Sequence, residues 1–301
     1  MRALFIINPH AAGGYALEVW RKLEAQARRD FAEVQTLISR SSAELPAALD
    51  AAADQGLQAV VSIGGDGSSH SLVNALMRQR QARPQVNLAF GCVPAGTGRD
   101  WARGVDTALN PAEALRRIAL ARPRLIDVGH LRYDGRDEYF LNIATAGISA
   151  LVVKYVDQAK PRRPWTFLRA TLRSLFNYRS QPMQISLDDQ PWYAGPVYLA
   201  AIANGRYFGQ GMDVAPHARF DDGLLEVVVA EDLRLAQALG LLARLYRGAH
   251  LSHPRVRYAR ARQVSIHSLD GQLIGMDLDG EPAFGQRLSY ALHAQALSLL
   301  A

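Results

Sequence analysis

One stretch, Val60-Val61-Ser62-Ile63-Gly64-Gly65-Asp66-Gly67-Ser68, constrains the fold of this chain more than any other. Its apolar, β-branched run predicts a buried strand, and the abrupt change to glycines predicts a tight turn where the strand ends. A polar stretch of helical character, residues 69–79, follows at once. The sequence therefore predicts a buried strand that leads through a glycine turn to the N-terminus of a helix.

The composition of this turn suits a bound phosphate. Gly64, Gly65 and Gly67 carry no side chains that would keep a phosphate from their backbone N–H groups. The helix start adds unpaired donors and the positive end of its dipole, and Ser68 adds a hydroxyl. A carboxylate would repel phosphate on its own, so Asp66 indicates a divalent cation beside the phosphates. A glycine turn of purely structural use is the alternative.

The first 125 residues alternate between strand-like and helix-like patterns. Besides the strand that ends at Gly64, the expected strands are residues 2–7, 31–38 and 86–92. The expected helices are residues 16–29 and 42–55, the second with Ser42 as its N-cap. Strands that alternate with helices form βαβ units and a parallel sheet. An N-terminal three-layer α/β nucleotide domain of residues 1–125 is therefore expected.

Two more strands of this sheet are expected to end in turns at the same edge. One turn begins at Asn8, and the other is Pro94-Ala95-Gly96-Thr97-Gly98. Open α/β sheets bind ligands at the carboxyl ends of their strands, so we expect Asn8, Gly96 and Thr97 to lie near a nucleotide. Asp100 is expected either to assist the cation or to cap a helix. Neither a Walker A loop nor a Rossmann fingerprint fits the glycine turn.

After Arg124 the chain changes to short strand-like runs separated by turn signals. The turn signals are Asp134-Gly135, Asp188-Asp189-Gln190-Pro191, Asp221-Asp222-Gly223, Asp270-Gly271 and Asp279-Gly280. This spacing predicts an antiparallel, β-sandwich-like domain of residues 126–289. Its few expected helices are residues 149–158, 166–178 and 233–247. The last strand-like run could return to the first domain, in which case residues 290–301 complete that domain.

Composition is ordinary for a globular protein, and 301 residues favour two domains. The single cysteine, Cys92, excludes an internal disulfide and lies in an apolar run, so we expect a buried structural thiol. The apolar run at the N-terminus is too short for a signal peptide. No segment reaches the roughly 18 apolar residues that a membrane span needs. A cytoplasmic protein is expected.

The net charge of +6, from 34 Lys and Arg against 28 Asp and Glu, is unevenly distributed. No acidic residue occurs between Asp157 and Asp188, or between Asp232 and Asp270, although basic residues are frequent in both stretches. Such blocks form a solvated basic face, a nucleic-acid surface or a surface for an anionic membrane.

The first of these blocks contains a basic amphipathic pattern. Apolar residues with helical spacing are Trp165, Leu168, Leu172, Leu175 and Phe176. The arginines beside or before them are Arg162, Arg163, Arg169 and Arg173. A basic amphipathic helix can lie on an anionic membrane. The alternative is that the apolar stripe packs on the sheet.

Taken together, these motifs resemble the diacylglycerol kinase catalytic-domain family, which includes bacterial lipid kinases and the sphingosine and ceramide kinases. The glycine turn alone would also fit the NAD kinases. In the second half, the segments similar to the family are Asn142–Gly147, Asn204–Met212, Ala215–Leu225 and Leu278–Pro282. With the three turns of the first half, the resemblance is collinear over residues 6–282.

The resemblance implies a kinase that uses ATP and Mg²⁺. At the acidic turn, Asp222 would supply a carboxylate to a magnesium site, with main-chain carbonyls near Arg219 and Leu224. The segment from Leu278 would be catalytic, because a lipid hydroxyl needs a carboxylate to accept its proton during phosphoryl transfer. Asp279 and Glu281 both suit that role, since residues two apart on a strand share a face. The resemblance favours Glu281.

Three positions depart from the family pattern. Ser68 stands where the family usually has Thr, so the hydroxyl is kept. Arg99 stands where Asn is usual, and Ser71 where Glu is usual. The last two changes bear on details of nucleotide binding, including the preference for ATP, and not on the class of reaction.

The sequence therefore predicts a lipid kinase whose catalytic residues are Asp66, Asp279 and Glu281. Its substrate would be diacylglycerol or a related lipid, and its partner an anionic membrane at the inner face, with no nucleic acid. A homo-oligomer is compatible with the sequence. Two alternatives remain open: a soluble-substrate kinase of the NAD kinase type, and a catalytically silent lipid- or nucleotide-binding module.

Overall fold

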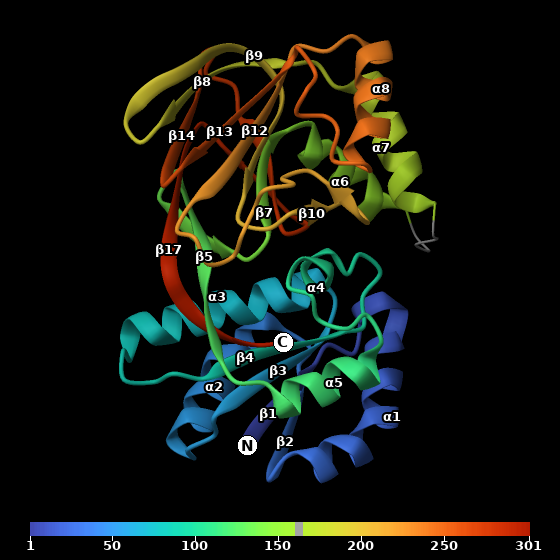
Figure 1. Cartoon of the computed structure of the whole chain (residues 1–301), viewed down its shortest axis with the longest axis vertical. Coiled ribbons are helices and arrows are strands. Elements are labelled where there is room, and N and C mark those ends of the chain that lie inside the picture. Colours follow the sequence, from blue (N-terminus) through green and yellow to red (C-terminus); the bar gives the residue numbers. More distant parts are fainter. Residues whose placement is uncertain (160–164) are drawn as a thin grey trace. The chain divides into compact units, whose positions relative to one another are not determined.

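The computed structural model describes residues 1–159 and 165–301. The chain divides into two compact units, of which the first is formed by Met1–Val128 and Ala294–Ala301 and the second by Gly129–His293 (Figure 1). The first unit is therefore built from both ends of the chain. Together the units form a mixed α/β protein with a parallel sheet portion and an antiparallel portion, which confirms the predicted fold class.

The first unit is organised around parallel strands in the order β17-β4-β3-β1-β2. These strands are β1 (Arg2–Ile7), β2 (Glu33–Ile38), β3 (Ala59–Gly64), β4 (Ala89–Pro94) and the end of β17 (Arg287–Leu300). All six residues of β3 are buried, as its apolar run predicts. The last residues of the chain pair with β4, so β17 completes the edge of this sheet.

Helices cover both faces of the sheet, which gives three layers (Figure 1). The helices are α1 (Tyr15–Asp30), α2 (Leu45–Asp54), α3 (Asp66–Ala82), α4 (Asp100–Gly104) and α5 (Pro111–Leu120). On one face, α1 and α5 pack with alternate residues of β1, β3 and β4 in one apolar core. On the other face, α2 and α3 contact each other, and α3 contacts β3.

Two helix starts differ from the sequence-based expectation. Helix α3 begins at Asp66, so the second half of the expected loop is its first turn. Ser42 is not an N-cap: the Ser41 hydroxyl accepts a hydrogen bond from the Ala43 N–H at 3.2 Å, and this caps the short 3₁₀ turn η2 (Ser42–Glu44) before α2. Both short polar residues can serve as caps, and the backbone bend decides which one does.

The second unit is built from antiparallel strands. Its principal strand order is β16-β15-β7-β9-β8-β14-β17, with β12 pairing β9 and β13, and β5 pairing β6 and β17. The strands are β5 (Arg124–Tyr133), β6 (Arg136–Phe140), β7 (Ile143–Gly147), β8 (Gln181–Leu187), β9 (Gln190–Ala203), β12 (Leu225–Glu231), β13 (Val256–Ala261), β14 (Gln263–Ser268), β15 (Ile274–Leu278) and β16 (Glu281–Gly285). A separate small ribbon joins β10 (Tyr207–Phe208) to β11 (Met212–Asp213).

Three of the predicted turn signals close two-residue hairpins. In Asp134-Gly135, Asp188-Asp189 and Asp279-Gly280, both residues have positive φ, between 45° and 99°. This is the conformation that type I′ hairpin turns require, and Asp and Gly adopt it at low cost.

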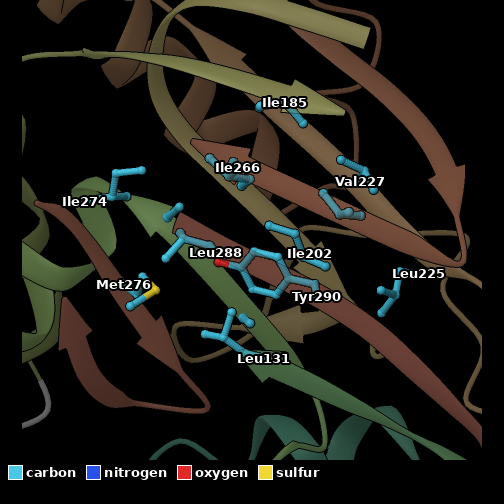
Figure 2. Packing of buried hydrophobic residues seen from close by; sticks show 14 of the residues in the cluster. Leu131, Ile185, Ile202, Leu225, Val227, Ile266, Ile274, Met276, Leu288 and Tyr290 are labelled. Carbon is cyan, nitrogen blue, oxygen red and sulfur yellow. The ribbon is translucent and has the colours of Figure 1, made fainter. Parts of the chain in front are cut away.

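The core of the second unit lies between its strands. Figure 2 shows apolar side chains from strands far apart in the sequence, among them Leu131, Ile202, Ile266 and Tyr290, packed into one cluster. Three helices flank the strands: α6 (Ile148–Gln158), α7 (Thr166–Asn177) and α8 (Leu235–Leu245). They share a second apolar cluster with side chains of β9 and β12.

Candidate active site

In the first unit, the two glycine turns that were predicted at the sheet edge are in backbone contact. A Cβ atom placed on Gly96 would lie 2.4 Å from the Cα of Gly65. The N–H of Ala95 also donates to the carbonyl oxygen of Gly64 at 2.8 Å. No side chain fits between these turns, so glycine is required there by close approach. The structure therefore joins the ends of β3 and β4 into one surface.

The Asp66 carboxylate lies in this surface. Asp66 is in the first turn of α3, and its Oδ1 accepts a hydrogen bond from the Trp101 N–H at 3.4 Å. A Cβ atom on Gly98 would lie 2.6 Å from Oδ2 of Asp66 and 3.7 Å from Oδ2 of Asp100. Gly98 therefore leaves room for two carboxylates on the same side of the turn.

Asp100 is not the N-cap of α4, because Arg99 occupies that position, and the Arg99 side chain makes no capping hydrogen bond among the described residues. It is the first residue of α4, it is 6% exposed, and its Oδ1 accepts from Arg103 at 2.7 Å. Its other carboxylate oxygen is the one beside Gly98. Carboxylate oxygens are hard ligands of the kind that Mg²⁺ prefers. The donor set of Asp66 and Asp100 thus fits a magnesium ion held together with phosphate oxygens and water.

The turn after β1 joins the same surface. The Asn8 side-chain amide donates to the Ser68 hydroxyl at 3.1 Å, and its oxygen accepts from the His10 N–H at 2.9 Å. A Cβ on Gly64 would lie 2.4 Å from the Ser68 Oγ, so this glycine makes room for the serine. Asn8, Gly64, Gly65, Asp66, Gly67, Ser68 and Gly96 are therefore brought together.

Thr97 and Arg99 have different surroundings. Thr97 is exposed at the tip of its turn. Arg99 has a left-handed backbone conformation, with φ of 57°, and its Nε donates to the Gly96 carbonyl oxygen at 3.2 Å. Asn adopts this conformation more readily than Arg. The backbone conformation at this position thus explains why Asn would suit it better than Arg.

Cys92 is confirmed as a buried thiol. It lies in β4, 7% exposed, with its sulfur 3.3 Å from the Ser69 hydroxyl. Burial raises the pKa of the Cys92 thiol to about 12, with Asp66 also raising it. A thiol of that pKa stays protonated at neutral pH and is a poor nucleophile.

In the second unit, Asp279 does not lie on a strand. It is the first residue of the β15–β16 hairpin turn, with φ of 51°. Its carboxylate accepts three backbone hydrogen bonds, from Leu141 at 2.7 Å, Asn142 at 3.0 Å and Ile143 at 3.1 Å. The premise that Asp279 and Glu281 share the face of one strand is therefore wrong.

The environment of Glu281 differs from that of Asp279. It is the first residue of β16, opposite Leu278 in the hairpin, and it is exposed. A third acid, Asp277, which the sequence analysis missed, lies beneath the same turn: it is 7% exposed, and its Oδ1 accepts from the Gly280 N–H at 2.7 Å. Asp277 and Asp279 thus shape the hairpin that presents Glu281.

The Asn204–Met212 segment of the second unit packs next to the residues that hold Asp279. The side chain of Asn142 donates to the Tyr207 carbonyl oxygen at 2.5 Å, and the backbone N–H of Gly205 donates to the Asn142 carbonyl oxygen at 2.8 Å. A Cβ on Gly205 would lie 2.1 Å from the Asn142 Oδ1 and 2.6 Å from the Phe220 ring. All four of the segments that resemble the family therefore meet in this unit.

The acidic turn contains an unexpected partner. Asp222 accepts from the Leu224 N–H at 3.1 Å through Oδ1 and forms a close ion pair with Arg260 through Oδ2. Arg219 is paired with Asp221 instead, at 3.3 Å. Burial alone would lower the pKa of Arg260, but Glu226 and Asp222 raise it. Glu226 and Arg260 were missed because cross-strand register cannot be read from either segment alone.

The predicted apolar stripe of α7 is only partly a packing face: Leu172 and Leu175 are half-buried, and Leu175 packs against the apolar cluster shared with α6 and α8. Trp165, Leu168 and Phe176 are 57%, 48% and 61% exposed. Small and polar residues are buried instead: Thr166, Ala170, Thr171 and Ser174. Of the basic residues in the predicted pattern, Arg162 and Arg163 lie outside the described residues.

Comparison with known protein families identifies the family of this chain. Residues 2–131 match the model of the diacylglycerol kinase catalytic domain. Residues 142–301 match that of the YegS C-terminal NAD kinase beta sandwich-like domain. This chain belongs to the diacylglycerol kinase catalytic-domain family of lipid kinases. The predicted resemblance is thereby confirmed for both units.

Similar proteins carry corresponding names. A Chromohalobacter salexigens protein named "Probable lipid kinase YegS-like" is 30% identical over 83% of this chain and 78% of its own length. A Mycobacterium tuberculosis protein named "Diacylglycerol kinase" is 28% identical over 87% of this chain and 83% of its own length. The crystal structure of a diacylglycerol kinase from Bacillus anthracis superposes with a TM-score of 0.74 at 19% identity, covering 99% and 96% of the two chains.

Within residues 1–159 and 165–301, no helix is both long enough and apolar enough to cross a bilayer.

Proposed function

We propose that this chain is an ATP- and Mg²⁺-dependent lipid kinase that phosphorylates a hydroxyl group of diacylglycerol or a related lipid. The observation that carries the proposal is the backbone contact of Gly65 with Gly96 beside the Asp66 carboxylate. It supports a surface in which backbone N–H donors and a helix N-terminus bind phosphate, while a carboxylate binds the cation beside it.

Each group of the first unit has a defined task in this proposal. Backbone N–H groups of the first turn of α3 bind phosphate oxygens, since a helix leaves its first N–H groups without intrahelical partners. Ser68, positioned by Asn8, adds a hydroxyl donor. Asp66 and Asp100 hold the magnesium ion, which supplies charge neutralisation to the phosphates when bound.

Glu281 is proposed as the general base. The lipid hydroxyl oxygen forms a bond to the terminal phosphorus of ATP, the bond from that phosphorus to the bridging oxygen breaks, and ADP leaves. The hydroxyl proton passes to the Glu281 carboxylate. Asp279 is assigned to positioning, because its two oxygens already accept three backbone N–H groups. The three backbone hydrogen bonds of Asp279 support this choice of base.

Exposed apolar side chains on two helices of the second unit support a lipid acceptor over a soluble one. Helices α7 and α8 contact each other and lie side by side in Figure 1. Each presents exposed apolar side chains with helical spacing: Trp165, Leu168 and Phe176 on α7 and beside it, and Leu235, Leu239 and Tyr246 on α8 and beside it. We define these six residues as the apolar patch.

The charge around the apolar patch fits an anionic bilayer. Arg169 and Arg173 on α7 are exposed, and Arg244 on α8 is exposed as well. No acidic residue occurs in residues 165–187 or 233–269. Apolar insertion combined with basic residues is how amphipathic helices bind anionic membranes in the interface plane. We propose that this patch docks the kinase on the lipid surface that holds its substrate.

The function is tested with a lipid extract, labelled ATP and Mg²⁺, followed by mass spectrometry. We expect one lipid class to gain a phosphate. Asp66→Asn, which keeps size and removes charge, should lower kcat by several orders of magnitude, because phosphoryl transfer depends on positioning and charge. Asp106→Asn, at an exposed acid of the same unit, is the matched control. A folded Asp66→Asn protein with a near-normal rate would remove the proposed magnesium site, and phosphorylation of soluble acceptors alone would contradict the lipid substrate.

A further inference from the structure

The acidic turn of the second unit faces a fixed positive charge of the chain itself. Arg260 on β13 is the direct cross-strand partner of Glu226 on β12. The Nε of Arg260 lies 2.8 Å from Oε1 of Glu226, and its Nη2 forms the close ion pair with Oδ2 of Asp222. One guanidinium thus bridges the turn before β12 and the strand that follows it.

The Asp222 carboxylate is committed to these contacts, whereas Glu226 has the Arg260 ion pair and, within the part of the chain that the structure describes, no hydrogen-bond partner on either oxygen. Oδ1 of Asp222 accepts from the Leu224 N–H, and Oδ2 binds Arg260. Glu226 is fully buried, with 0% exposure. A magnesium ion needs about six oxygen ligands in near-octahedral geometry. Within residues 1–159 and 165–301, no group of three or more His, Cys, Asp or Glu residues is arranged to hold a metal ion. Asp222, the carboxylate that the resemblance assigns to the cation, has both oxygens engaged by groups of the chain, and the adjacent guanidinium would repel a cation. Its surroundings therefore do not fit the cation that the family resemblance implies.

We propose that Arg260 takes the place of a divalent cation at the acidic turn, so that the second unit is held in shape without a metal ion. Its guanidinium suits that task because it stays charged and presents several donors in a fixed plane, which lets one side chain bind two carboxylates. The buried Glu226 needs such a partner, since an unpaired buried carboxylate is strongly destabilising.

This arrangement has a consequence for the metal requirement of the kinase. The acidic turn keeps its conformation whatever the concentration of Mg²⁺. If the proposed function also holds, the dependence of turnover on Mg²⁺ comes from the nucleotide alone. The structural part of the inference does not rest on catalysis, and it is tested without nucleotide.

The test compares the full chain with Arg260→Met, which keeps an unbranched, flexible side chain and removes the guanidinium with its charge. Thermal unfolding is followed in EDTA and with added Mg²⁺ or Mn²⁺, and Mn²⁺ binding is measured by electron paramagnetic resonance. We expect no Mn²⁺ bound at the turn of the wild-type protein and no change in its Tm. Arg260→Met should unfold several degrees lower in EDTA and recover part of that loss with Mn²⁺.

Two further variants make the outcome specific. Asp222→Asn combined with Arg260→Met should show no recovery with Mn²⁺, because a turn ligand is lost. Arg262→Met, at an exposed arginine that forms no ion pair among the described residues, should behave as wild type. A wild-type Tm that rises with Mg²⁺ and no longer rises in Asp222→Asn would overturn the proposal. So would an Arg260→Met protein with unchanged stability. If Arg260→Met does not fold, Arg260→Lys serves the same comparison, with a smaller loss expected.

Discussion

Asp279→Asn and Glu281→Gln should have opposite effects, although the two acids are separated by one residue. Both substitutions keep the size of the side chain and remove its charge. Asp279 binds three backbone N–H groups at 2.7, 3.0 and 3.1 Å, whereas Glu281 is exposed. The structure therefore predicts a loss of stability from the first substitution and a loss of catalysis from the second.

The magnitude follows from the hydrogen bonds of Asp279. A hydrogen bond to a charged group contributes roughly 1.5–3 kcal/mol. In Asp279→Asn, the amide oxygen can keep the bonds from Asn142 and Ile143, weakened to those of a neutral acceptor. The amide nitrogen then faces the Leu141 N–H, so two donors meet and that bond is lost. The free energy of unfolding should fall by about 2–5 kcal/mol, or roughly 5–15 °C in Tm.

Glu281→Gln should leave the free energy of unfolding within about 0.5 kcal/mol, as is usual for an exposed side chain. Its single-turnover rate at saturating ATP should fall roughly 10²-fold or more, as expected when a general base is removed. Both variants should bind ATP as the wild-type protein does, because neither residue belongs to the first unit.

The two measurements are thermal unfolding and single-turnover phosphorylation of the same preparations. An Asp279→Asn protein of unchanged Tm would show that the three backbone hydrogen bonds contribute little. Near-normal rates in both variants would place the base at another residue. A Glu281→Gln protein that is slow because it is unfolded is excluded by its own Tm.

Two further predictions concern the glycine contact and the apolar patch. Gly96→Ala should lower the free energy of unfolding by about 1–3 kcal/mol, because its Cβ would meet the backbone of Gly65, and it should weaken ATP binding in calorimetry. The control is Gly240→Ala, at a helical position where an added Cβ would meet nothing within 4 Å; it should stabilise the protein by roughly 0.5–1 kcal/mol. Equal behaviour of the two variants would contradict the contact between Gly96 and Gly65. The double variant Arg169→Gln, Arg173→Gln should bind anionic vesicles roughly 30-fold more weakly at low salt, at about 1 kcal/mol per arginine, and added salt should reduce the difference. Turnover of a short-chain, water-soluble lipid should not change. Unchanged vesicle binding would contradict a role of α7 in membrane docking.

The sheet edge could be predicted because its signals are local. Three strands of the first unit, β1, β3 and β4, are short apolar runs, and each is followed within a few residues by glycines or Asn-Pro. The parallel arrangement then places these ends at one edge. The hairpins of the second unit could be predicted for the same reason, since the backbone preferences of Asp-Gly pairs favour type I′ turns. These predictions depend on neighbouring residues and on the general geometry of parallel sheets and hairpins.

Contacts between distant segments could not be predicted in this way. Arg260 lies opposite Glu226 because β12 and β13 pair in one register out of several that alternation would allow. The three donors that hold Asp279 come from residues more than 130 positions earlier in the chain. The sequence supplied two equivalent carboxylates, and only the turn conformation at Asp279 separates a positioning residue from a candidate base.

The face of α7 shows a limit of a different kind. Helical spacing predicts that apolar residues share one side of a helix, and it does not say whether that side faces protein or solvent. The side of α7 that packs inward carries the buried Ala170, Thr171 and Ser174 and the half-buried Phe167 and Leu175, whereas Trp165, Leu168 and Phe176 remain exposed. Exposure of large apolar side chains is costly in water unless a partner covers them. The arginines on the same helix make an anionic lipid surface the partner that fits both features.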